Sequence, residues 1–172
     1  MPRDTQPFAP APDRPARGAA PVGHLDDLDP VEATAVLCLR LWCEGPEAQA
    51  QVWADFATTL GPSAGRAALA DFEELCGLCL RHARRPLMRH GLGCRCLGAD
   101  EACFAAFIGY AAEGRTEDAF LMAAAMVRPD LAHALTGLAQ SVGLAFRRMA
   151  LRAGAQASVS GPAPAPAPAR LH

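Results

Sequence analysis

The stretch Phe72–Phe104, FEELCGLCLRHARRPLMRHGLGCRCLGADEACF, organises the rest of the chain. It holds five of the seven cysteines and five of the sixteen arginines. A Cys-x-x-Cys pair, Cys76 and Cys79, is followed across a basic, glycine-containing connection by a Cys-x-Cys pair, Cys94 and Cys96. Two closely spaced cysteine pairs joined by a loop are typical of a metal site. We therefore expect this stretch to bind a metal ion.

The first half of the stretch is predicted to be helical. Apolar residues recur at helical spacing over about 62–84, and Phe72, Cys76 and Cys79 share one face of that helix. Their side chains should therefore point toward the core rather than toward water. A proline and three closely spaced glycines then interrupt the helix, so we expect an irregular loop over about 85–99.

The remaining central sequence shows the same helical periodicity. Aspartate, threonine or proline opens most of its apolar runs, and glycine or Arg-Pro closes most of them. Aromatic residues make up only 6% of the chain and alanine is abundant, which favours closely packed helices over sheets. The expected fold is all-α, a compact bundle of about six helices with an irregular Cys- and Arg-rich loop between the third and fourth. The expected helices span about 30–44, 47–60, 62–84, 101–113, 116–128 and 130–152.

One helical domain, 29–152, is expected between two disordered ends. Residues 1–28 are rich in Pro, Ala, Gly, Asp and Arg without apolar periodicity, and residues 153–172 end in a Pro-Ala repeat. Such compositions do not bury enough apolar surface to offset the entropy lost on ordering. We therefore expect a disordered leader and a disordered tail.

The sequence predicts a cytoplasmic protein without membrane contact. No apolar run approaches the length of a membrane span, and the N-terminus does not resemble a signal peptide. In a reducing compartment, cysteines serve as metal ligands, reactive thiols or small core residues rather than as a disulfide framework. This expectation directs attention to the four paired cysteines.

Structural zinc is the predicted cofactor, because four thiolates suit a tetrahedral ion. In an extended backbone Cys94 and Cys96 would point to opposite sides, so both can bind only if the chain turns between them. The predicted ligands are Cys76, Cys79, Cys94 and Cys96, with His82, His90 and Cys103 as substitutes. An iron–sulfur cluster, redox-switching thiols and plain packing are the alternatives. Cys38 and Cys43 are interpreted as packing residues.

Five arginines surround these cysteines, and no acid occurs between Glu74 and Asp100. Arginine near a thiol favours the thiolate and offsets the charge of a four-thiolate site. The same side chains could contact an anion or a partner molecule. Aromatic residues for stacking on bases are absent from the basic segment, so nucleic acid is the less favoured partner. The arginines in question are Arg81, Arg84, Arg85, Arg89 and Arg95.

The pattern favours a small metal-binding regulatory or interaction protein with a protein partner. The alternative is an iron–sulfur or thiol redox accessory protein or enzyme. We find no combination of nucleophile, base and orienting group, which favours a non-enzymatic role without deciding it. The sequence does not fix the oligomeric state.

Overall fold

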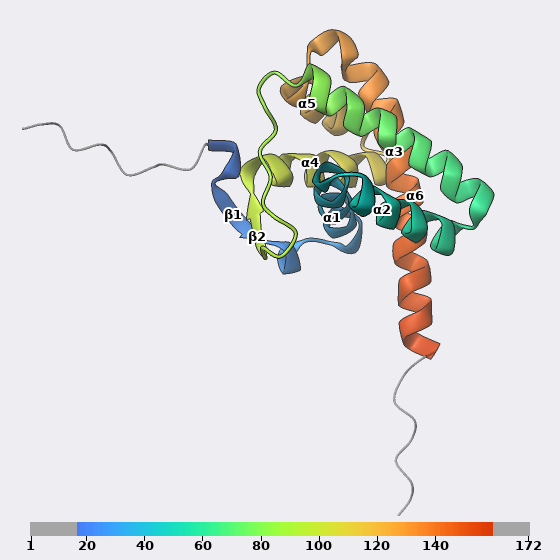
Figure 1. The fold of residues 1–172 in the computed structure, drawn as a ribbon. Helices are drawn as coiled ribbons and strands as arrows, with labels where there is room; N and C mark the ends of the chain where they lie inside the picture. Colours follow the sequence, from blue (N-terminus) through green and yellow to red (C-terminus); the bar gives the residue numbers. More distant parts are fainter. Residues whose placement is uncertain (1–16, 160–172) are drawn as a thin grey trace, which may run out of the picture.

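The computed structural model describes residues 17–159 of the chain, with side chains described up to residue 156 (Figure 1). The expected disorder of residues 1–16 and 160–172 lies outside the described residues. Within the described part, six α-helices form a compact bundle, so the all-α prediction is confirmed. The helices are α1 (Pro30–Glu44), α2 (Pro46–Leu60), α3 (Pro62–His82), α4 (Ala99–Ala112), α5 (Thr116–Met126) and α6 (Ala132–Val159).

Local signals explain why the first three helices begin and end where they do. The Asp29 carboxylate accepts hydrogen bonds from the Val31 and Glu32 backbone N–H groups at 2.7 and 3.0 Å, as expected of an N-cap. Gly45 and Gly61 separate α1 from α2 and α2 from α3. Both have positive φ angles, 123° and 88°, a conformation that side chains disfavour. These two glycines let the chain reverse with almost no connecting loop.

Three phenylalanines join α2, α3 and α6 at the centre of the core. Phe56, Phe72 and Phe146 are fully buried, and their ring centroids lie 5.7–6.0 Å apart in all three pairs. Such contacts add to the stabilisation from buried apolar area. The helix α4 packs against α1, α5 and α6, and it crosses the middle of the bundle (Figure 1). The N-terminal end of α4 is therefore held firmly beside α1.

A small antiparallel sheet extends the folded part back beyond residue 29. The strand β1 (Pro21–His24) pairs with β2 (Cys96–Gly98), and Gly23 lies opposite Leu97. Two 3₁₀ turns flank β1, at Arg17–Ala19 and Leu25–Asp27. The described residues of the expected leader thus belong to the fold. Neither strand is long enough to show the alternation of buried and exposed residues that marks a longer strand.

Some helix ends differ from those expected. The helix α3 ends at His82, because Ala83 forms a β-bridge with Val127 and leaves the helix. A 3₁₀ turn at Pro129–Leu131 precedes α6, which continues to Val159. The helix α4 begins at Ala99, two residues before the expected start, so Gly98 occupies the N-cap position and Asp100 lies inside the first turn. No helix among the described residues is long and apolar enough to cross a membrane.

Candidate functional site

A buried ion pair between α1 and α4 is the centre of the candidate site. Arg40 and Glu101 both have side chains with 0% exposure. The Arg40 Nε and Nη2 groups donate to the two Glu101 carboxylate oxygens, each at 2.7 Å. Charges are rarely buried unless they are paired and their remaining hydrogen-bonding groups are satisfied. The partners that satisfy this pair come from the chain between α3 and α4.

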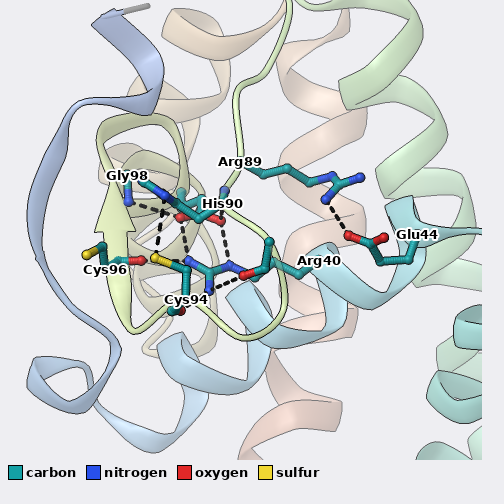
Figure 2. A network of polar contacts seen from close by, with 9 residues as sticks. Arg40, Glu44, Arg89, His90, Cys94, Cys96 and Gly98 are labelled. Carbon is teal, nitrogen blue, oxygen red and sulfur yellow. Dashed lines mark hydrogen bonds and ion pairs between the residues drawn. The ribbon is translucent and has the colours of Figure 1, made fainter. Parts of the chain in front are cut away.

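Residues 83–98, here called the 83–98 segment, wrap around this pair (Figure 2). Arg40 donates to the carbonyls of Gly91 at 3.2 Å, Cys94 at 2.6 Å and Cys96 at 2.8 Å. Glu101 accepts from the backbone N–H groups of His90 at 3.0 Å and Gly98 at 2.9 Å. The pair therefore replaces the regular hydrogen bonds that this irregular backbone lacks.

The protonation of Glu101 follows from these contacts. Burial alone would raise the pKa of the carboxyl group. The hydrogen bonds from Arg40 and from the Gly98 and His90 N–H groups outweigh burial and lower the pKa below its usual value. Glu101 is therefore ionised at neutral pH and matches the charge of Arg40.

Sequence reasoning missed this pair. Arg40 is the single charged residue between Ala33 and Cys43 in an otherwise apolar helix, and that isolation was the available signal of a buried charge. Glu101 lies in the first turn of α4, where the helix dipole already favours an acid, so its sequence position gives no sign of a buried partner. The Glu101 carboxylate accepts a hydrogen bond from the N–H of the N-cap residue Gly98, but its main role is to bind Arg40 and the 83–98 segment.

Three arginines of the 83–98 segment form ion pairs with carboxylates. Arg85 binds Asp100 through both guanidinium nitrogens, and the Met88 N–H also donates to Asp100 at 2.9 Å. Arg89 donates to Glu44 at 2.8 Å, and Arg95 pairs with Asp26. None of these three acids lies between Glu74 and Asp100 in the sequence, so the sequence of this acid-free stretch does not reveal the partners of its arginines.

The other two arginines are placed at the end of α3 and just beyond it. Arg84 donates to the Ala124 carbonyl of α5 at 3.3 Å. Arg81 is exposed, and its guanidinium lies beside Gly77, one turn earlier in the same helix.

Cys76 and Cys79 lie in the core, as the helical phase predicts. They are 0% and 1% exposed. Burial raises the pKa of Cys79 to about 12 and that of Cys76 well above its usual value, with a further contribution to Cys76 from Cys79, Cys43 and Cys38. The α1 cysteines, assigned to packing alone, are therefore electrostatic neighbours of Cys76. In these surroundings Cys76 and Cys79 are neutral thiols at neutral pH.

Cys94 and Cys96 lie on the 83–98 segment, beside His90, and both are partly exposed. The Cys94 sulfur is 3.7 Å from His90 Nδ1 and faces the imidazole ring (Figure 2). The neighbouring Cys94 thiol raises the pKa of Cys96. His90 Nε2 is buried and has no hydrogen-bond partner among the described residues. The structure thus brings a substitute ligand and two predicted ligands into one neighbourhood.

The two cysteine pairs do not combine into one metal-binding group. Among residues 17–159, no group of three or more His, Cys, Asp or Glu side chains is arranged to hold a metal ion. His82 ends α3, where its carbonyl accepts from the Arg128 N–H, and Cys103 is exposed on α4. The zinc and iron–sulfur assignments stay predictions.

No protein-family model, curated protein or solved structure matches the chain. Functional inference therefore rests on the geometry of the site itself.

Proposed function

We propose that the protein is a thiol redox accessory protein in which Cys94 and Cys96 interconvert between two thiols and a disulfide. The observation that carries the proposal is the placement of two partly exposed thiols two residues apart, on backbone that Arg40 holds, with the Cys94 sulfur 3.7 Å from His90 Nδ1. Both sulfurs are partly exposed, so a disulfide in solution can reach them.

The surroundings assign different roles to the two thiols. The pKa of Cys96 is raised, first by the neighbouring Cys94 thiol, which disfavours the Cys96 thiolate. The Cys94 sulfur lies 3.7 Å from His90 Nδ1, which can accept its proton. Cys94 is therefore the attacking thiolate and Cys96 the resolving thiol.

The reaction is a thiol–disulfide exchange with a small disulfide as oxidant. The Cys94 thiolate attacks one sulfur of the small disulfide, forms a mixed disulfide and releases one thiolate. Cys96 then loses its proton and attacks the Cys94 sulfur, which releases the second thiolate and leaves the Cys94–Cys96 disulfide. Two protein thiols are oxidised and one small disulfide is reduced to two thiols.

The Arg40–Glu101 pair supports this chemistry by fixing the backbone. Arg40 binds the carbonyls of both Cys94 and Cys96, so the turn between the two thiols is held by a buried group. Side chains placed on a fixed backbone keep a productive geometry better than those on a free loop.

The test is oxidation of the full chain in buffers of graded glutathione and glutathione disulfide, followed by mass spectrometry of peptides. The expected result is an internal Cys94–Cys96 disulfide. Cys96→Ser should stop at a mixed disulfide on Cys94, and Cys94→Ser should react more slowly. Cys103→Ser, which removes another exposed thiol, is the matched control and should behave as the native chain does. A mixed disulfide that forms on Cys96 of the Cys94→Ser variant as fast as one forms on Cys94 of the Cys96→Ser variant, or no internal disulfide in the native chain, would refute the proposal.

A zinc-binding regulatory or interaction protein is the second candidate. It is supported by the effect of Cys79, Cys43 and Cys38 on the pKa of Cys76, which indicates that these thiols lie near one another, although the described residues hold no group already arranged around an ion. Zinc would have to displace protons from buried thiols and draw the sulfurs together. Untagged protein prepared without oxygen should then contain about one zinc per chain, and a strong chelator should lower its melting temperature. Metal-free protein whose melting is indifferent to the chelator would exclude this candidate, and visible absorbance with bound iron would indicate an iron–sulfur cluster instead.

A further inference from the structure

A cavity of about 180 Å³ lies between α4, α5 and the start of the 83–98 segment. Cys103 of α4 and two methionines of α5, Met122 and Met126, line it. The two methionines are four residues apart, so their side chains leave the same face of α5. Methionine is unbranched and flexible, which lets a thioether sulfur adjust its position within such a space. Three sulfur-containing side chains from two packed helices thus line one small cavity.

The other polar side chains that line this cavity already bind each other. Asp100 accepts from Arg85 at both oxygens, with the Nη1 contact at 2.7 Å, and it also accepts from the Met88 N–H. Asp100 is 6% exposed, whereas the Arg85 side chain is 60% exposed, so the carboxylate is shielded from water and the guanidinium covers it from the solvent side. The Asp100 carboxylate is therefore already hydrogen-bonded. The remaining lining side chains that could act as metal ligands are the three that contain sulfur.

We propose that Cys103, Met122 and Met126 form a binding site for a single Cu(I) ion. Soft thiolate and thioether ligands select Cu(I), whereas Mg²⁺ and Ca²⁺ require oxygen ligands that this cavity does not offer. A set of one thiolate and two neutral thioethers gives an overall neutral site with a monovalent ion. Neutrality suits a cavity whose lining is mostly apolar.

Arg85 lies close enough to Cys103 for their charges to interact. Its guanidinium is bound to both oxygens of the Asp100 carboxylate. No unpaired positive charge of Arg85 therefore opposes a cation in the cavity.

This site shares no residue with the proposed redox pair, so either proposal can fail alone. Because Cys94 and Cys96 are also able to bind Cu(I), the experiment uses the full chain carrying Cys94→Ser and Cys96→Ser. This chain is titrated with Cu(I) without oxygen against a coloured Cu(I) chelator. The expected result is one tightly bound Cu(I) per chain. X-ray absorption should show sulfur neighbours around copper and no imidazole nitrogen.

Two further variants test the ligands. Cys103→Ser and the double variant Met122→Leu/Met126→Leu should each lower Cu(I) affinity by more than about 100-fold, since losing even an outer partner of a ligand costs 10–100-fold. Leucine conserves the volume of methionine, so the fold is kept, and circular dichroism verifies this. Met149→Leu on α6 changes a methionine outside the cavity. This variant should bind Cu(I) as tightly as the chain that carries only Cys94→Ser and Cys96→Ser. Absence of tight binding in the background chain, or unchanged binding in either ligand variant, would overturn the proposal.

Discussion

The two cysteine pairs have similar spacing in the sequence and opposite surroundings in the structure. Cys76 and Cys79 lie inside α3 and face the core, where burial makes them neutral thiols. Cys94 and Cys96 lie on irregular backbone that a buried ion pair holds against α1 and α4, and their sulfurs are partly exposed. Spacing alone therefore does not assign a role to a cysteine pair. Whether a cysteine pair packs or reacts depends on the secondary structure in which it lies and on the contacts that fix that part of the backbone.

The largest expected effect on stability comes from removing the buried charge of Arg40, which holds the backbone of Cys94 and Cys96 but not that of Cys76 and Cys79. Arg40→Met leaves Glu101 buried without its partner, and breaking a buried pair in this way costs about 3–5 kcal/mol. Chemical denaturation should show this loss in the free energy of unfolding. Alkylation of the native variant should become faster at Cys94 and Cys96, while Cys76 and Cys79 stay protected.

The control for that variant is Arg128→Ala. It removes one partner of an ion pair in which both side chains are more than half exposed, at 64% and 58%. The free energy of unfolding should be almost unchanged. Equal losses in the two variants would contradict the special role given to Arg40.

Alkaline pH should destabilise the fold through the buried thiols. The pKa of Cys38 and that of Cys79 are raised by burial to about 12, from a usual value of 9.0. Above pH 9 the unfolded chain loses these protons while the folded chain keeps them. The free energy of unfolding should therefore fall with rising pH, by about 1 kcal/mol per pH unit for each thiol. Denaturation between pH 9 and 11 measures the slope, and Cys79→Ala should reduce it; an unchanged slope would argue against a raised pKa.

Serine substitution compares buried and partly exposed thiols directly. Cys76→Ser places a hydroxyl group in a fully buried position and should cost about 1–3 kcal/mol, unless the group finds a partner. Cys43→Ser, at a partly exposed position, should cost clearly less. Thermal denaturation of both variants gives the comparison, and equal shifts in melting temperature would show that burial does not distinguish these thiols.

The smallest expected change in stability is that of Cys94→Ser. This side chain is partly exposed, and the polar contact of its sulfur is with the His90 imidazole, so the free energy of unfolding should change by about 0.5 kcal/mol or less. The same variant should lose the internal disulfide with Cys96. A large loss of stability would mean that Cys94 is a structural residue.

Elements with local signals could be predicted from the sequence. The helix α1 combines an Asp29 cap, a proline in its first turn and a glycine at its end, and the structure has the helix between those signals. The inward direction of Cys76 and Cys79 followed from helical phase and is confirmed by their burial.

Features that depend on distant partners could not be predicted in the same way. Arg40 and Glu101 are 61 residues apart, and the sequence around each residue does not indicate that the other is its partner. The β1–β2 pairing joins strands of four and three residues, too short for a periodic pattern. The neighbourhood of Cys38, Cys43 and Cys76 depends on how α1 packs beside α3, which periodicity does not specify.

The contrast between the two pairs can be measured in one experiment. The native chain is treated with a thiol-alkylating reagent for graded times at neutral pH, and the extent of modification at each of the seven cysteines is read by mass spectrometry. The account predicts early modification of Cys94 and the exposed Cys103, and almost none at Cys38, Cys76 and Cys79 until the chain unfolds. Modification of Cys76 and Cys79 as fast as that of Cys94 would contradict it.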